Sequence, residues 1–186
     1  MLTNHLKHHA PFFARDVRKN LDILDRDQSF GAATKWCILL ACANATQCGP
    51  LIDAVLDAAG DQLSQKHKKA ADDAAAVMFL QSIQDRLTLI DEKREYLCIL
   101  PRLATKALDR PSVDQVEFDM VCFAVLSMIG PVESMRNYEI VLRKRGVTKK
   151  QILALVQYAA IMKATAVSIS SASARVMRRS DAKLAA

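Results

Sequence analysis

Cysteine is the residue type in this chain best suited to redox or nucleophilic chemistry. The five cysteines are Cys37, Cys42, Cys48, Cys98 and Cys122. No two of them form a Cys-x-x-Cys pair, the spacing that brings an attacking and a resolving thiol onto one helical turn. Their spacings fit neither a disulfide framework nor a zinc site, and most of their neighbours are apolar, which is typical of reduced, buried thiols. The sequence therefore predicts a cytoplasmic protein with no metal site.

Other residue types that carry chemistry give weaker patterns. His5, His8 and His9 have no cysteine or carboxylate at metal-ligand spacing, so we expect a mobile N-terminus there. The sequence contains no Gly-rich phosphate loop, no Gly-x-Ser-x-Gly elbow and no His-Glu-x-x-His motif. We therefore expect no cofactor.

Charge is unevenly distributed along the chain. Residues 1–134 hold 15 Lys and Arg against 18 Asp and Glu, a net charge of −3, whereas residues 135–186 hold 11 against 2, a net charge of +9. Basic runs lie at 66–69, 143–145 and 149–150. Because no aromatic residues are interleaved with them, these runs favour a solvated or partner-facing surface over a nucleic-acid site.

The composition of the chain predicts that helices carry all of these residues. The 186 residues include only five Gly and five Pro, and hydrophobic residues make up 51%. Few breakers, few β-branched or aromatic runs and many straight-chain residues favour helix over strand. The N-terminus lacks the apolar stretch of a signal peptide, and the longest uncharged run, residues 36–52, is too short and too polar for a membrane span. We predict one all-α domain over residues 1–186, outside any membrane.

Breakers and caps divide the chain into predicted helices. These span residues 11–24, 32–46, 50–59, 64–84, 112–130, 131–146 and 148–173. Ser112 with Gln115, and Thr148 with Gln151, match the capping-box spacing at a helix start. Residues 85–111 are interpreted as a connector with short helical pieces, and residues 175–186 as a frayed basic tail.

The two halves of the chain carry the same marks in the same order. Each has an apolar helix, a Gly-Pro pair, a helix that ends at Gly, a Ser or Thr cap and a long helix with a run of Ala before Met. The offset between the halves is about 84 residues. We interpret this pattern as an internal duplication with repeats at approximately 30–84 and 112–174.

Several of these segments together resemble one known family. The segments are Phe12–Leu21, Trp36–Thr46, Ala74–Met78, Phe118–Val125, Leu142–Arg143 with Gly146–Val147, and Tyr158–Ile161. They resemble the AhpD alkylhydroperoxidase family of the carboxymuconolactone decarboxylase-like superfamily, over residues 11–174. The resemblance implies a duplicated helical fold, assembly as a homotrimer, peroxide reduction, and partnership with a peroxiredoxin and a lipoyl-dependent reductant.

The family's catalytic residues are replaced in this sequence. The resemblance implies a Cys-x-x-Cys pair at a helix N-terminus, helped by two His and one Glu. The two Cys positions fall on Pro131 and Ser134, the inner His on Glu133, the outer His on Tyr138, and the Glu on Asp119. Pro131 can neither ionise nor attack, and Ser134 has no candidate base four residues further on. Catalysis by a dithiol at this site is therefore excluded.

Another thiol is a possible substitute for the missing pair. Cys48 precedes Gly49-Pro50, the counterpart of Gly130-Pro131 in the first repeat, and Cys42 lies six residues earlier. One hypothesis is a relocated reactive thiol at Cys48 or Cys42. The alternative, favoured because no His or Lys stands beside Cys48, is a cysteine packed at a helix end.

Three functional hypotheses follow from the sequence. The first is an AhpD-like antioxidant protein that has lost its catalytic pair and serves as a scaffold or peroxiredoxin partner. The second is a binding module whose altered pocket, lined by Asp119, Glu133, Ser134 and Tyr138, holds a small ligand or a loop of a partner. The third is a thiol-independent enzyme that uses Asp119 or Glu133 as a general acid or base.

Overall fold

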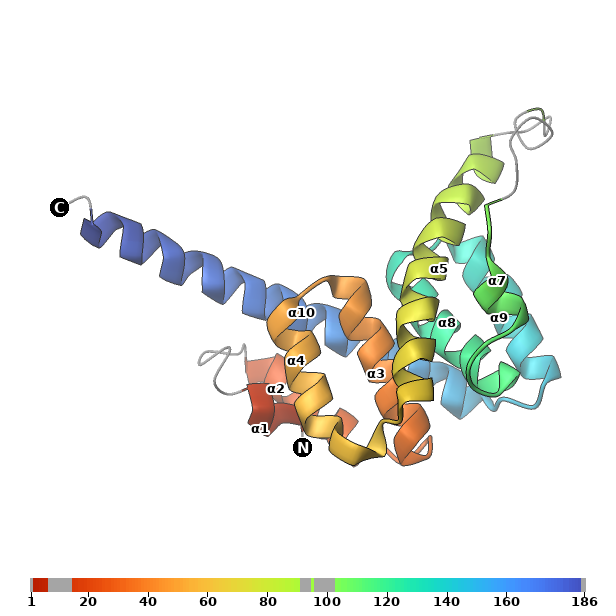
Figure 1. Ribbon diagram of the computed structural model, residues 1–186, viewed down its shortest axis with the longest axis horizontal. Helices are drawn as coiled ribbons and strands as arrows, with labels where there is room; N and C mark the ends of the chain where they lie inside the picture. Colours follow the sequence, from red (N-terminus) through yellow and green to blue (C-terminus); the bar gives the residue numbers. More distant parts are fainter. Residues whose placement is uncertain (1, 7–14, 91–94, 96–102, 185–186) are drawn as a thin grey trace.

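The protein is built from helices throughout the part of the chain that the structure describes. The computed structural model describes residues 2–6, 15–90, 95 and 103–184, and within them every regular element is a helix (Figure 1). The predicted all-α class is confirmed. Cys98 and the expected first turn at Pro11, Phe12 and Phe13 lie outside the described residues, as do His8 and His9.

Four helices form the core of the bundle. They are α3 (Ala32–Thr46), α5 (Gln65–Ile90), α8 (Gln115–Ile129) and α10 (Lys149–Leu184). The central pair is α3 and α8, which pack against each other and each against both α5 and α10. Both central helices are apolar on nearly every face, as a helix without a solvent side must be. Both helices contribute long runs of buried apolar side chains to the core, and the burial of such side chains drives folding.

Shorter helices cover the core. α4 (Gly49–Ala59) packs on α3, and α9 (Val132–Lys144) packs on α8. α2 (Arg15–Arg26) lies against α10, while α1 (Leu2–Leu6) contacts α2 and α4. The single turns η1 (Gly60–Gln62) and α7 (Lys106–Asp109) precede α5 and α8. The last part of α10 projects from the bundle, and the end of α5 rises beyond its neighbours (Figure 1).

Several predicted helix boundaries are confirmed. α3 spans the predicted residues 32–46, and α4 ends where Gly60 adopts a positive φ of 49°. α10 begins with the predicted capping box: the amide of Gln151 donates to Thr148 Oγ1 (3.2 Å), and the amide of Thr148 donates to Gln151 Oε1 (3.0 Å).

Other boundaries differ from the prediction for identifiable reasons. The cap of α8 is Asp114, whose carboxylate accepts from the amides of Val116 and Glu117, whereas Ser112 donates to the carbonyl of Lys66. α5 continues through Ile90, so the first residues of the predicted connector are helical. α10 continues to Leu184, past the predicted end at residue 173.

The expectation of a mobile N-terminus is wrong for residues 2–6. They form α1, and its Leu2 and Leu6 are fully buried. The amide of Leu2 donates to the carboxylate of Asp25 in α2 (3.1 Å). Two buried leucines and this bond anchor a segment that is too short to fold alone.

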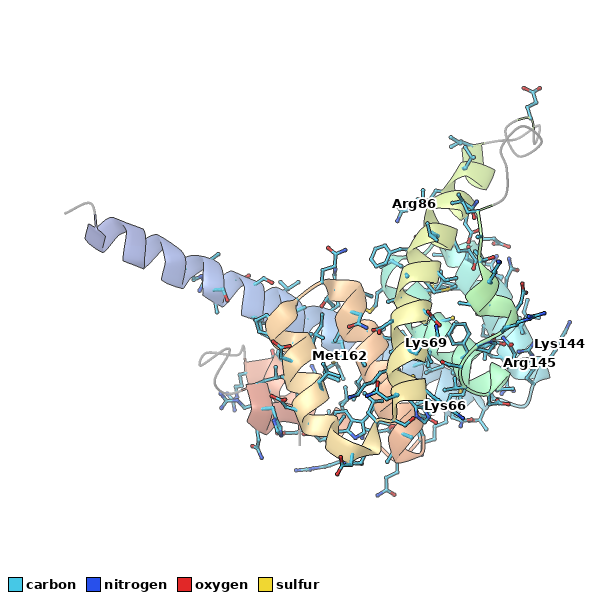
Figure 2. All side chains as sticks on the ribbon, viewed as in Figure 1. Lys66, Lys69, Arg86, Lys144, Arg145 and Met162 are labelled. Carbon is cyan, nitrogen blue, oxygen red and sulfur yellow. The ribbon has the colours of Figure 1, made fainter. Side chains whose placement is uncertain are left out.

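The stretch Lys149–Arg175 of α10 has the length and apolar composition to cross a membrane, which the sequence analysis did not single out. Of the most apolar 18-residue window in this stretch, 44% is buried inside the bundle. Met162, labelled in Figure 2, lies on this helix and is fully buried. The stretch meets this criterion by its length and composition alone.

Candidate functional site

The candidate site begins where α8 passes into α9. Gly130 ends α8, and a side chain there would meet the backbone oxygen of Leu126, 2.9 Å from where a Cβ would lie. Pro131 then takes the N-cap position of α9 with φ −64° and ψ 149°, which its ring favours. This tight Gly-Pro junction places Glu133 and Ser134 in the first turn of α9.

A polar cavity of about 180 Å³ lies between the second half of α5 and the start of α9. Its lining residues are Gln81, Asp85, Pro131, Glu133, Ser134, Asn137 and Tyr138. Four of the five positions singled out in the sequence therefore lie around one cavity. Gln81, Asp85 and Asn137 were not anticipated, because no spacing rule relates α5 to α9.

Ser134 is held by a carboxylate from the other wall of the cavity. Its hydroxyl donates a short hydrogen bond to Asp85 Oδ2, and the residue is buried. Ser134 lies in the first turn of α9, where the helix dipole and free amides favour a negative charge. The Asp85 carboxylate thus supplies the negative charge that this helix end favours.

Tyr138 lies one turn further along α9 and is partly buried. Burial, followed by the nearby Cys122, Asp119 and Asp85, raises the pKa of the Tyr138 phenol well above its ordinary value. The phenol therefore remains protonated at neutral pH and can donate a hydrogen bond into the cavity.

Asp119 does not line the cavity. Its carboxylate on α8 forms a close ion pair with Arg145, the residue that follows α9 (Figure 2), and accepts from Gln115 Nε2 at 3.0 Å. Glu133 stands at the cavity rim and pairs with Arg136 at 2.8 Å. Neither carboxyl is isolated in apolar surroundings, the setting that the acid–base hypothesis requires.

None of the described cysteines lines this cavity, although Cys122 lies near Tyr138. Cys37, Cys42, Cys48 and Cys122 are all buried and free. Burial raises the pKa of both Cys37 and Cys42 to about 12, and raises that of Cys122 well above its ordinary value. Cys48 occupies the N-cap position of α4, makes no side-chain cap bond and is only 6% exposed.

The site offers polar binding groups rather than a strong nucleophile. No thiol is among the residues that line the cavity. Within the described ranges, no group of three or more His, Cys, Asp or Glu residues could hold a metal ion. The Gln81 Oε1 atom is buried without a described hydrogen-bond partner, so it is an acceptor that a bound molecule could satisfy.

Comparison with known proteins identifies relatives over nearly the whole chain. No family model matches it. The chain is 34% identical over 177 residues to "Alkyl hydroperoxide reductase AhpD" of Bradyrhizobium sp. (strain BTAi1). The matched residues make up 95% of this chain and 97% of the relative. It is also 34% identical over 169 residues to the protein of the same name from Rhodopseudomonas palustris (strain BisA53). That match covers 91% of this chain and 93% of the relative. With the all-helical fold, these similarities show that the chain belongs to the AhpD family of alkyl hydroperoxide reductases.

Proposed function

We propose that this protein serves the alkyl hydroperoxide reductase system as a catalytically impaired AhpD-like member, with a scaffold or peroxiredoxin-partner role. The observation that supports this proposal is the composition of the cavity at the start of α9. Pro131 and Ser134 occupy the positions that the family resemblance assigns to the reactive thiols, and no cysteine lines the cavity.

Physical chemistry supports the impairment. Reduction of a peroxide by this route needs a thiolate that attacks the O–O bond and a second thiol that resolves the product. Ser134 offers a hydroxyl in place of a thiol, and a hydroxyl that donates a hydrogen bond to Asp85 still cannot pass through the sulfenate and disulfide states of this route. The buried thiols of Cys37 and Cys42 are neutral at physiological pH, because a pKa of about 12 leaves almost no thiolate.

The surface of α9 supports a role through association. Three of its apolar residues are substantially exposed: Val132, Ile140 and Val141. Lys144 ends the same helix, and the basic side chains Lys66, Lys69 and Arg145 also lie in the half of the molecule that holds α8 and α9 (Figure 2). A homotrimer, a peroxiredoxin and a lipoyl-dependent reductant, all in the cytoplasm, are the proposed partners and setting.

A turnover assay tests the impairment. The native chain is incubated with cumene hydroperoxide and dihydrolipoamide, with the Bradyrhizobium relative assayed in parallel as the positive control. We expect no turnover by the native chain above the rate without protein. Turnover that survives the replacements Cys42→Ser and Cys48→Ser would contradict both the impairment and the relocated-thiol hypothesis.

A second candidate function is ligand binding in the altered cavity. It is favoured by the buried acceptor Gln81 Oε1, which has no partner among the described residues, and by the protonated Tyr138 phenol, which lines the same cavity. A small polar ligand or a loop of a partner would satisfy these groups. Loss of binding in Tyr138→Ala, with retained folding, would distinguish this function from an empty remnant of the catalytic site.

A further inference from the structure

A second and larger cavity lies on different helices from the site described above. It is a groove of about 400 Å³ between α2 and α10. Cavities of this size are typical of sites for small organic molecules. Apolar side chains form its walls, and four polar residues face it: Asn20, Asp27, Gln157 and Tyr158.

The apolar walls remain partly open to solvent. Ile23 of α2 is 61% exposed, and Val17 and Ile161 are partly buried. Ala160 and Ala164 of α10 leave room between these larger side chains. A molecule seated here would cover apolar surface that is now exposed to water, which favours binding.

The polar end of the groove is rigid. The Tyr158 side chain is almost completely buried, and its hydroxyl donates to Asp27 Oδ2 at 2.6 Å. Ser29 donates to the same carboxylate through its amide (3.2 Å) and its hydroxyl (2.9 Å). The Phe30 ring packs edge-on against Tyr158 with centroids 5.8 Å apart. These contacts fix the carboxylate and the phenol in place.

Lys35 completes this polar end from α3. Its ammonium donates to three carbonyls at the end of α2: those of Leu24 (2.6 Å), Asp25 (3.2 Å) and Asp27 (2.8 Å). Burial acts to raise the pKa of Asp27, but the hydrogen bonds from Tyr158 and Ser29 and the charge of Lys35 outweigh it and lower the pKa. Asp27 is therefore an anion, and the Lys35 ammonium that bonds to the neighbouring carbonyls adds positive charge close to it.

The unused hydrogen-bonding capacity of Asp27 and Tyr158 is that of an acceptor. A carboxylate has about four acceptor positions, and Tyr158 and Ser29 use three of those on Asp27. Tyr158 has already donated its only hydroxyl proton, so its oxygen can only accept. A molecule that completes the network of Asp27 must supply a donor, and the nearby Lys35 ammonium disfavours a donor that is itself a cation.

We propose that the groove between α2 and α10 binds a small molecule with an apolar body and one hydroxyl group. The hydroxyl donates to Asp27 or to the oxygen of Tyr158. The apolar body lies against Val17, Ile23 and Ile161 and reaches the two alanines of α10. This site is independent of the cavity at the start of α9, with which it shares no lining residue.

Calorimetric titration of the full chain with three matched probes tests the ligand class. The probes are 2-phenyl-2-propanol, its methyl ether and the corresponding amine. We expect the alcohol to bind at least about tenfold more tightly than the ether, which lacks the donor. Tighter binding of the amine than of the alcohol, or equal binding of alcohol and ether, would overturn the proposal.

Two substitutions locate the site. Ala164→Trp fills the groove from an exposed position and should abolish binding of the alcohol, whereas Ala174→Trp, on the same helix outside the groove, should leave it unchanged. Asp27→Asn should weaken binding of the alcohol but not of the ether. If no probe binds, the proposal is wrong, and a change of the oligomeric state by Ala164→Trp would then identify the groove as an interface between copies of the chain.

Discussion

The thiols of Cys37, Cys42 and Cys122 illustrate how local surroundings decide the chemistry of a residue. All three are buried in α3 and α8, where burial raises the pKa of each thiol above its ordinary value of 9.0. A reactive cysteine needs the reverse environment, with positive charge and access to solvent. At the scale of single residues these three cysteines are therefore small core side chains.

A thiol-modification experiment checks this interpretation. In a Cys98→Ser background, we expect the remaining thiols to react with a disulfide reagent at pH 8 only as the chain unfolds, so that urea accelerates the reaction. Above pH 9 the folded thiols hold protons that the unfolded thiols release, so the free energy of unfolding should fall as pH rises. Rapid modification of one thiol, abolished by Cys48→Ser, would instead support a relocated reactive cysteine.

The junction between α8 and α9 shows a constraint at the scale of elements. The amide of Gly130 donates to the carbonyl of Leu126 at 2.7 Å, so the chain turns closely around the buried Leu126 before Pro131 starts the next helix. A Cβ at position 130 would collide with both the side chain and the backbone oxygen of Leu126. The junction requires glycine for space.

Replacement of this glycine tests the constraint. Gly130→Ala should lower the free energy of unfolding by about 1–3 kcal/mol, because Leu126 must shift within a packed core. Gly49→Ala is the matched control at the corresponding Gly-Pro pair, since a Cβ there would meet no atom within 4 Å and should cost little. Chemical denaturation of both variants measures the difference, and equal losses would refute the steric explanation.

Local patterns predicted the elements better than the contacts between them. Thr148 and Gln151 form the expected capping box, because both partners lie within one turn. The predicted cap of α8 at Ser112 is wrong, because Ser112 donates to the carbonyl of Lys66 across the fold and Asp114 caps the helix instead. Asp85 meets Ser134 across 49 residues, so no local spacing could have placed it in the site.

At the scale of the whole molecule, α10 combines a core helix with an extension. Its last buried residue among the described side chains is Ile169, and Ser170 and Ser171 beyond it are exposed. The backbone nonetheless remains helical to Leu184 and leaves the bundle (Figure 1). Among the described side chains of α10, none beyond Ile169 is buried in the bundle.

Truncation separates the two parts of α10. A chain ending at Arg175 should unfold within about 2 °C of the full-length protein, because no described buried side chain is removed. A chain ending at Thr165 loses the buried Ala166 and Ile169 and should melt several degrees lower. Calorimetry measures both melting temperatures. A large drop in the melting temperature of the chain that ends at Arg175 would show that the extension stabilises the bundle.

The bond between Ser134 and Asp85 also sets a requirement for engineering a thiol into this cavity. A Ser134→Cys substitution would place the new thiol beside the Asp85 carboxylate, and repulsion between like charges would disfavour its thiolate. A reactive thiol at position 134 therefore requires that Asp85 be replaced together with Ser134.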